Sequence, residues 1–322
     1  MRAVVQTTYG GTDRLRYEEH PEPTPGPEEV LVEVRAAGVD RGTWHLMTGR
    51  PYAARIVVGL RRPKSPVVGR DVAGVVIAVG DRVTRAAVGD EVMGTASGSF
   101  AERAVVPEAR LAHKPASASF AEAAVLPISG GTALQALRDV GRLRPGQRVL
   151  VIGASGGVGS YAVQIATAMG AEVTAVASRH KADLVRSLGA VDVIDYAAEE
   201  VDARGPRFNL VLDLAGNRPI AVLRRALTPT GTLVIAGGDT GGRWLGGTQR
   251  QLFAIARSLF TTQRLTGLLS REDGKDYAEL AELVDSRRVR PALERTYPLH
   301  EAAKAIDHLA AGHVRGKVAL TV

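Results

Sequence analysis

The chain of 322 residues contains no cysteine, and this absence excludes several kinds of chemistry. Disulfide bonds, thiolate catalysis and every zinc site that needs a cysteine ligand are ruled out. Aromatic residues make up only 4%, so we expect a core built mainly from alanine, valine, leucine and isoleucine. No uninterrupted apolar run reaches the ~18 residues that a membrane-spanning helix requires, and no targeting signal is recognisable. We therefore expect a cytoplasmic protein.

Lysine is also scarce, with 6 residues against 35 arginines, and the formal net charge is +7. The arginines are scattered among aspartates and glutamates, which favours an arginine-rich surface over a nucleic-acid-binding face. Apolar residues make up 45% of the chain, and glycine is abundant at 36 residues. The length suggests two domains, and the glycine content points to tight turns and close backbone contacts with a ligand.

The chain changes character near Ser119. Before it, short strand-like runs alternate with turn-forming residues, a pattern typical of a small antiparallel barrel. From there to about Phe260, strands alternate with helices, as in a parallel sheet with helices on both faces. The tail ends in a strand-like run that the N-terminal barrel can accept. We thus predict an α/β chain in which a β-rich domain of residues 1–118 and 262–322 flanks a domain of residues 119–261.

The strongest chemical signal is an apolar strand, residues 149–152, that runs into a glycine-rich turn and a helix. Gly153, Gly156 and Gly159 recur at a spacing of three. A turn without side chains lets the backbone approach a pyrophosphate, and the free N–H groups of the helix start favour an anion. In this strand–turn–helix context the pattern predicts dinucleotide binding. The predicted contacts are Gly153, Ala154, Ser155, Gly156, Gly157, Val158 and Gly159.

The end of the next strand indicates which dinucleotide binds. An NAD site usually carries an acidic residue there, which accepts a hydrogen bond from the ribose. This chain has Ser178, Arg179, His180 and Lys181, a hydroxyl and three basic groups that suit a 2′-phosphate. We predict NADP(H), with Ser178, Arg179 and Lys181 as contacts; the alternative is a solvated helix start that is basic by chance. Tyr196, after the third strand, is either a neighbour of the adenosine phosphate or an ordinary surface tyrosine.

Two further glycine turns follow later strands of the same pattern. They contain Ala215 with Gly216, and Gly237 with Gly238. Ligands bind at the carboxyl edge of an open parallel sheet, so we expect these turns to line the nicotinamide. Read alone, each is only a loop.

These motifs resemble those of a known family. The turn at residues 153–159, the segment 129–137 before it and the segment 67–76 together resemble the zinc-independent quinone oxidoreductase branch of the medium-chain dehydrogenase/reductase superfamily. The segment 313–318 fits the C-terminal strand of that family. The resemblance implies a GroES-like catalytic domain built from both termini, a central Rossmann domain, a cleft between them and often a homodimer. It also adds Thr132, Arg315 and Lys317 to the expected cofactor contacts.

The resemblance also bears on zinc. Zinc-dependent relatives carry a cysteine, a histidine and a second cysteine at positions that here match Asp40, Arg70 and the cysteine-free stretch 129–132. Arginine is no zinc ligand, and its positive charge repels the ion. His45 beside Asp40 makes too few ligands for a new site. We therefore expect no metal, which favours hydride transfer to a quinone or an α,β-unsaturated ketone over ordinary alcohol oxidation.

The catalytic candidates are Asp40, Tyr52 and Thr132. Quinone reductases of this type commonly have asparagine where Asp40 stands, and the carboxylate either pairs with the neighbouring Arg41 or binds substrate. Tyr52 either donates to a carbonyl oxygen or lines the pocket as apolar bulk. Thr132 is expected to hydrogen-bond cofactor or substrate. The stretch 55–64, apolar and then basic, is either a lid or anion-attracting rim, or a solvated loop.

Three functions remain open from the sequence. The leading one is a metal-free, NADPH-dependent reductase of quinones or α,β-unsaturated carbonyls. The second is a zinc-less alcohol or carbonyl oxidoreductase of a specialised pathway, which uses Asp40 or Tyr52 in place of zinc. The third is a non-catalytic NADPH-binding sensor. The expected partners are a small-molecule substrate and a second copy of the chain, with no nucleic acid and no membrane.

Overall fold

The computed structural model describes residues 1–237, 242 and 244–322, and the chain divides into two compact units. Unit 1 comprises Met1–Gly131 and Glu272–Val322, and unit 2 comprises Thr132–Arg271. Both boundaries lie further along the chain than the expected ones at 118 and 262. The first boundary lies later than expected because α3 (Phe120–Ala123) packs on strands of unit 1. The second boundary lies later because β13 (Arg264–Gly267) joins the parallel sheet of unit 2.

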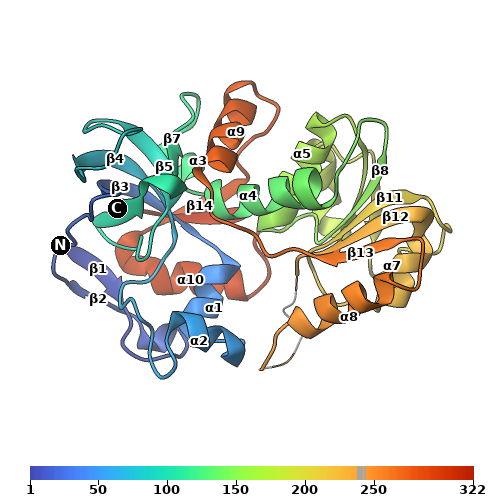
Figure 1. Cartoon of the computed structure of the whole chain (residues 1–322), viewed down its shortest axis with the longest axis horizontal. Coiled ribbons are helices and arrows are strands. Elements are labelled where there is room, and N and C mark those ends of the chain that lie inside the picture. Colours follow the sequence, from blue (N-terminus) through green and yellow to red (C-terminus); the bar gives the residue numbers. More distant parts are fainter. Residues whose placement is uncertain (238–241, 243) are drawn as a thin grey trace. The chain divides into compact units, whose positions relative to one another are not determined.

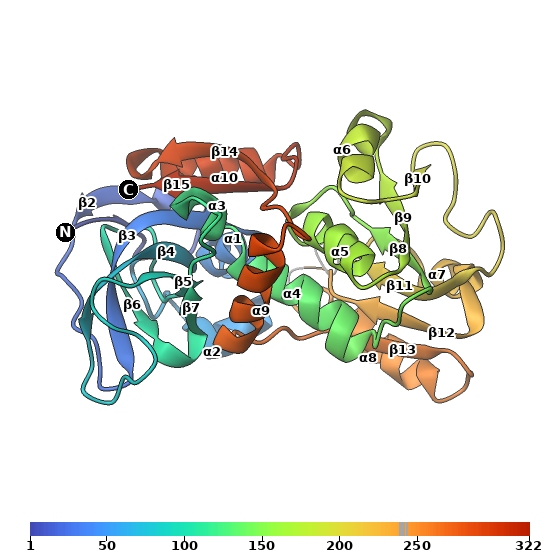
Figure 2. The ribbon, with the colours of Figure 1, turned by 90° about the horizontal axis from the view of Figure 1, so that it is seen from above.

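Unit 1 is built on a seven-stranded sheet in the order β14-β15-β3-β4-β5-β7, with β6 also paired to β3. The C-terminal β15 runs antiparallel to β3, with Val318 opposite Val39, so both ends of the chain build one sheet, as expected. Figure 2 shows this red strand close to the blue ones. A separate hairpin joins β1 and β2. The strands are β1 (Arg2–Val5), β2 (Arg16–Glu19), β3 (Glu29–Val39), β4 (Asp71–Val79), β5 (Glu91–Thr95), β6 (Arg103–Pro107), β7 (Leu111–His113), β14 (Leu293–Pro298) and β15 (Lys317–Thr321).

The core of unit 1 is aliphatic, as the scarcity of aromatic residues predicts. Buried valines of β3 and β4 dominate it, Phe100 lies among them, and Ala302, Ala305 and Ile306 of one helix pack onto the cluster. That helix is α10 (Ala302–Ala310). Besides α3 and α10, unit 1 contains α1 (Arg41–Thr48), α2 (Arg55–Val58) and α9 (Gly274–Asp285).

Unit 2 is a six-stranded parallel sheet in the order β10-β9-β8-β11-β12-β13. The first strand, β8, lies in the middle; the chain builds outward to β10 on one side and to β13 on the other. Figure 1 shows α5 on one face of this sheet and α7 and α8 on the other. This doubly wound order confirms the predicted Rossmann-like fold. The elements are β8 (Arg148–Ile152), β9 (Glu172–Ala177), β10 (Asp192–Asp195), β11 (Phe208–Asp213), β12 (Leu227–Ile235), α5 (Gly157–Ala168), α6 (Ala182–Ser187), α7 (Ile220–Ala226) and α8 (Thr248–Ser258).

Helix α4 (Pro127–Gln135) spans the boundary between the two units in the sequence. None of the described helices combines the length and the apolar character that crossing a membrane demands.

Candidate active site

The glycine turn of unit 2 connects β8 to α5. Gly153 has a φ of +82°, a conformation that glycine adopts far more readily than other residues. A Cβ on Gly159 would lie 2.1 Å from the Gly153 carbonyl oxygen, so only glycine lets the helix start so close to the turn. No side chain caps the helix at Gly156, which leaves its first N–H groups available. The turn therefore has the geometry and the free donors of a pyrophosphate-binding site.

The structure brings the later turns of unit 2 next to the glycine turn. A Cβ on Gly153 would lie 3.5 Å from the backbone nitrogen of Ala215, and one on Gly237 would lie 2.0 Å from the carbonyl oxygen of Leu214. The Ala154 N–H donates to the carbonyl of Val176 at the end of β9. Turns after four strands thus meet at the carboxyl edge of the sheet. Of the predicted contacts there, Gly238 lies outside the described residues.

A residue that the sequence reading missed holds these turns together. Asp213, at the end of β11, is fully buried. Its Oδ1 accepts from the Gly216 N–H at 3.0 Å, and its Oδ2 lies 2.6 Å from Nη1 of Arg250 on α8. Its carbonyl oxygen accepts from the N–H groups of Ala236 and Gly237. Asp213 is a positioning residue, and an aspartate that ends an apolar strand was its only sequence signal.

The predicted phosphate-binding residues follow β9, but they differ in exposure. Ser178 caps the short helical turn Arg179–Lys181, and its hydroxyl lies 3.2 Å from Nε2 of His180. Arg179 and His180 are exposed. Lys181 is only 9% exposed, so less of its side chain is accessible than of Arg179 and His180, and its predicted contact with the 2′-phosphate stays a prediction. Tyr196, directly after β10, is exposed, as either of its predicted roles requires.

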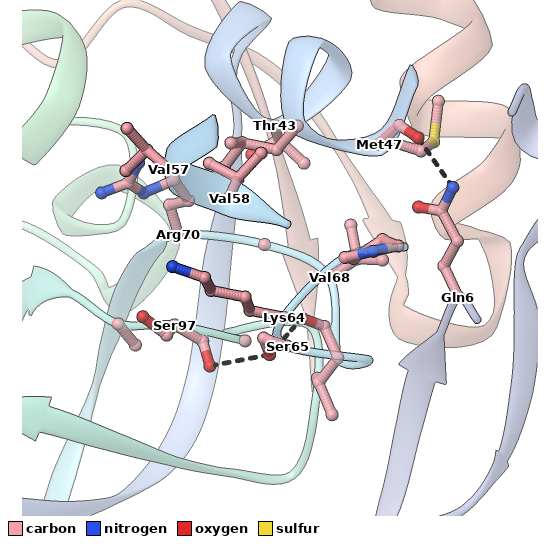
Figure 3. A pocket seen from close by; sticks show the side chains of 16 residues that line it. Gln6, Thr43, Met47, Val57, Val58, Lys64, Ser65, Val68, Arg70 and Ser97 are labelled. Carbon is pink, nitrogen blue, oxygen red and sulfur yellow. Dashed lines mark hydrogen bonds between the residues drawn. The ribbon is translucent and has the colours of Figure 1, made fainter. Parts of the chain in front are cut away.

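Unit 1 contains a cavity of about 250 Å³ beside α1 (Figure 3). Its walls are mostly apolar and come from five separate stretches of the chain. The predicted lid or loop is one of them, because residues of α2 and of the loop behind it form one side. The lining residues are Gln6, Thr43, Leu46, Met47, Val57, Val58, Pro63, Lys64, Ser65, Val67, Val68, Gly69, Arg70, Ala96, Ser97 and Gly98.

Asp40 lies under this cavity as the N-cap of α1. It is 4% exposed; its Oδ1 accepts from the Thr43 N–H and its Oδ2 from the Thr43 hydroxyl, each at 2.9 Å. Arg41 lies over the Trp44 ring, 5.2 Å from its centroid. Thr43 itself lines the cavity, so it connects the buried carboxylate to the space where a ligand can lie. The capping pattern Asp-x-x-Thr was the sequence signal for Thr43.

The other two catalytic candidates lie elsewhere. Tyr52 stacks against the Arg55 guanidinium, 4.7 Å from its ring centroid, and Arg55 also lies over Tyr9. Tyr52 is outside the lining of the cavity. Thr132 lies on α4 at the first residue of unit 2. The structure therefore groups Asp40 with Thr43 and adds neither Tyr52 nor Thr132 to this cavity.

The residues at the zinc positions do not fit zinc. Arg70 forms an ion pair with Glu272, whose other carboxylate oxygen lies 2.8 Å from Nη1 of Arg110. Both carboxylate oxygens of Asp40 already accept hydrogen bonds from Thr43. Among the described residues, no group of three histidines, cysteines or carboxylates could hold a metal ion. We derive no catalytic step through a metal.

Lys317, predicted to contact the cofactor, is part of a buried ion pair inside unit 1. It is 1% exposed, and its Nζ lies 3.2 Å from Oδ2 of Asp71, whose Oδ1 accepts from the Ile128 N–H. Burial raises the pKa of Asp71 to about 7; Lys317 opposes this rise and the Asp40 carboxylate adds to it. The ammonium is enclosed by this ion pair, and its predicted contact with the cofactor stays a prediction. Arg315, two residues earlier, is exposed, and its N–H donates to Glu294.

Known proteins resemble this chain along its whole length. Residues 26–116 match the alcohol dehydrogenase GroES-like domain, and residues 188–320 match the zinc-binding dehydrogenase family. The chain is 32% identical to the chloroplastic quinone-oxidoreductase QR1 of Triphysaria versicolor, over 99% of this chain and 97% of that one. It belongs to the medium-chain dehydrogenase/reductase superfamily, in the quinone oxidoreductase-like branch. This reductase-like chain is therefore an oxidoreductase.

Solved structures agree with this assignment. The quinone oxidoreductase from Coxiella burnetii is 28% identical with a TM-score of 0.87, covering 100% of this chain and 99% of that one. A mycobacterial protein solved in complex with NADPH is 29% identical with a TM-score of 0.85, covering 100% of both chains.

Proposed function

We propose that this oxidoreductase reduces a quinone or another α,β-unsaturated carbonyl with NADPH, and that it does so without a metal ion. The observation that carries the proposal is the cavity of unit 1, which is mostly apolar and has Arg70 where zinc-dependent relatives hold a histidine. Quinones are flat and apolar, and they accept a hydride without a Lewis acid because the charge delocalises onto oxygen. The names of the Triphysaria and Coxiella relatives support the same substrate class.

The turns of unit 2 support NADPH as the hydride donor. The Gly153–Gly159 cradle suits the pyrophosphate, and the exposed Arg179 and His180 with Ser178 suit a 2′-phosphate. When bound, the cofactor supplies a hydride from its nicotinamide. The mycobacterial protein solved in complex with NADPH supports the same cofactor.

Thr43 and Asp40 are our candidates for the proton that follows the hydride. In the structure the Thr43 hydroxyl donates to Asp40 Oδ2. In the proposed step, water supplies a proton to the Asp40 carboxylate, this hydrogen bond reverses, and the Thr43 O–H donates its proton to the acceptor oxygen that became negative on hydride transfer. The pair then returns to its starting state after Asp40 has passed its proton to Thr43. Arg70, held by Glu272, adds positive charge on the same cavity wall.

The test is NADPH oxidation with quinones, enones and simple aldehydes, with NADH in parallel and with a metal chelator. We expect turnover of quinones or enones, a preference for NADPH and no effect of chelator. Loss of activity in chelator contradicts the metal-free proposal, and equal use of NADH contradicts the cofactor preference. Tight NADPH binding without turnover of any acceptor favours the sensor.

We also propose that the enzyme is a homodimer formed through unit 2. Helix α8 exposes large apolar side chains, while its inward face carries Arg250, Gln251 and Ser258 beside the buried Ala254. β13, which α8 packs against, is an edge strand of the sheet with one unpaired side. A second copy of the chain that packs here buries the exposed apolar side chains and pairs with the edge strand at the same time. The exposed apolar residues are Leu252, Phe253, Ile255, Leu259 and Phe260.

Light scattering during size-exclusion chromatography tests the dimer. We expect twice the mass of 33.9 kDa for the native chain. The double variant Leu252→Glu, Leu259→Glu should elute as a monomer, because charges on an apolar contact must be desolvated. A native chain that is monomeric at micromolar concentration contradicts the proposal.

A further inference from the structure

The cavity of unit 1 carries positive charge on one side. Two cations, Lys64 and Arg70, are among its lining residues, and no carboxylate is. Figure 3 shows the Lys64 side chain extending toward the side on which Arg70 and Ser97 lie. In Figure 3, Met47 and Val68 lie on the other side of the cavity, whereas Val57 and Val58 lie near Arg70. The cavity therefore combines a cationic side with apolar walls.

The two cations differ in how they are neutralised. Arg70 shares Glu272 with Arg110, so one carboxylate serves two guanidinium groups and the cluster keeps a net positive charge. Lys64 lies in an exposed loop, and no described residue forms an ion pair or hydrogen bond with its ammonium. An ammonium of this kind is available to a ligand.

Apart from Glu272, which pairs with Arg70, the described segment that carries the two cations has only basic residues among its charged side chains. The stretch 53–70 contains Arg55, Arg61 and Arg62 besides the two lining cations, and no aspartate or glutamate. Asp40, the N-cap of the adjoining α1, is buried, and both of its carboxylate oxygens accept hydrogen bonds from Thr43. The field in the cavity is thus positive, and it favours an anion over a neutral molecule of the same shape.

We propose that the natural acceptor carries an anionic group, a carboxylate, sulfonate or phosphate, which Lys64 and Arg70 hold while the apolar walls hold the quinone or enone ring. This inference rests on the proposed function and specifies its substrate class. The alternative role for Lys64 is to stabilise the oxyanion that develops on any acceptor during reduction, and that role does not depend on a charged substituent.

A matched pair of acceptors separates these two roles. The values of kcat/KM are measured with 1,4-naphthoquinone-2-sulfonate and with 2-methyl-1,4-naphthoquinone, for the native enzyme and for Lys64→Met. We expect the ratio of sulfonated to neutral quinone to fall about tenfold in K64M, since a charge-assisted hydrogen bond is lost. Lys64→Arg should retain the native ratio. The matched control Lys275→Met removes the same charge from exposed α9, outside the cavity, and should leave the ratio unchanged.

Comparing the ratio in K64M with the ratio in the native enzyme cancels the intrinsic difference in reactivity between the two quinones. An equal loss of kcat/KM for both quinones in K64M overturns the proposal in favour of oxyanion stabilisation, and unchanged kcat/KM values for both quinones overturn any role for Lys64. If the native enzyme reduces neither quinone, the proposed function fails, and the charge preference is then measured by calorimetry with naphthalene-2-sulfonate and naphthalene-2-carboxamide. Tighter binding of the sulfonate that is lost in K64M supports the inference, and equal binding of the two probes overturns it.

Discussion

The glycine turns of unit 2 and the cavity of unit 1 are built in different ways. The turns use backbone atoms, and their position is set by neighbouring strands that end at one edge of the sheet. The cavity uses side chains from five stretches between Gln6 and Gly98. A site of backbone atoms depends on a few glycines and tolerates change elsewhere. A site of side chains changes its ligand with each substitution, which allows one fold to serve many substrates.

The largest effect should come from the glycine turn. Gly159→Ala places a Cβ 2.1 Å from the Gly153 carbonyl oxygen and 2.7 Å from the Ala154 Cα, so the turn must shift. We expect NADPH affinity to fall by more than about 100-fold, since a displacement of this size disrupts every contact of the turn. Fluorescence titration measures it. Gly156→Ala, whose Cβ would lie 3.5 Å from the same oxygen, should have the same melting temperature as the native enzyme. If G159A binds NADPH as tightly as the native enzyme does, the glycine turn is not the pyrophosphate-binding site.

The next effect tests the buried ion pair between Lys317 and Asp71 in unit 1. Lys317→Met leaves the Asp71 carboxylate buried without its cation, and we expect a loss of about 3–5 kcal/mol in stability. The pKa of Asp71, already raised to about 7, should rise further. Because that folded-state value lies above the unfolded one, stability is lost as pH rises through it, so the deficit should be larger at pH 8 than at pH 5.

Urea denaturation at both pH values, followed by a spectroscopic signal from unit 1, measures this loss of stability. Adding Asp71→Asn to Lys317→Met removes the unpaired charge and should recover part of the loss. A deficit that is equal at the two pH values contradicts the assignment of the unpaired charge to Asp71.

A smaller, purely catalytic effect is expected on the cavity side. Thr43→Val keeps the shape of the side chain but removes the hydroxyl next to Asp40. We expect kcat to fall about 100-fold through loss of proton delivery, with the NADPH dissociation constant unchanged. Thr43→Ser should retain most of the rate. A kcat of T43V within twofold of the native value excludes Thr43 as the donor.

The smallest effect should be at the phosphate end of unit 2. Arg179→Ala removes an exposed guanidinium, and we expect about tenfold weaker binding of NADPH with no change for NADH. Isothermal titration with both cofactors measures the difference. The matched variant Arg186→Ala, on the neighbouring α6, should change neither. If NADPH and NADH weaken equally in R179A, the arginine acts on something other than the 2′-phosphate.

Local patterns predicted most of the fold. The strands and helices of unit 2, the return of the C-terminal strand to the N-terminal sheet and the aliphatic core follow from periodicity and composition. The domain boundaries were harder, because α3 and β13 carry the same local signals in either unit and only their packing assigns them. The ion pair of Lys317 could not be predicted for a similar reason, since its partner Asp71 is far away in the sequence.

The sequence by itself determined the absence of cysteine chemistry, the glycine turn and the family resemblance, because these depend on residue identity and on contacts between near neighbours. Only the tertiary structure decided that Thr43 connects Asp40 to a cavity, that Asp213 ties together the turns after β11 and β12, and that Lys64 and Arg70 line the same cavity. Such contacts form when a sheet brings distant segments together, and no local pattern specifies which side chains then meet.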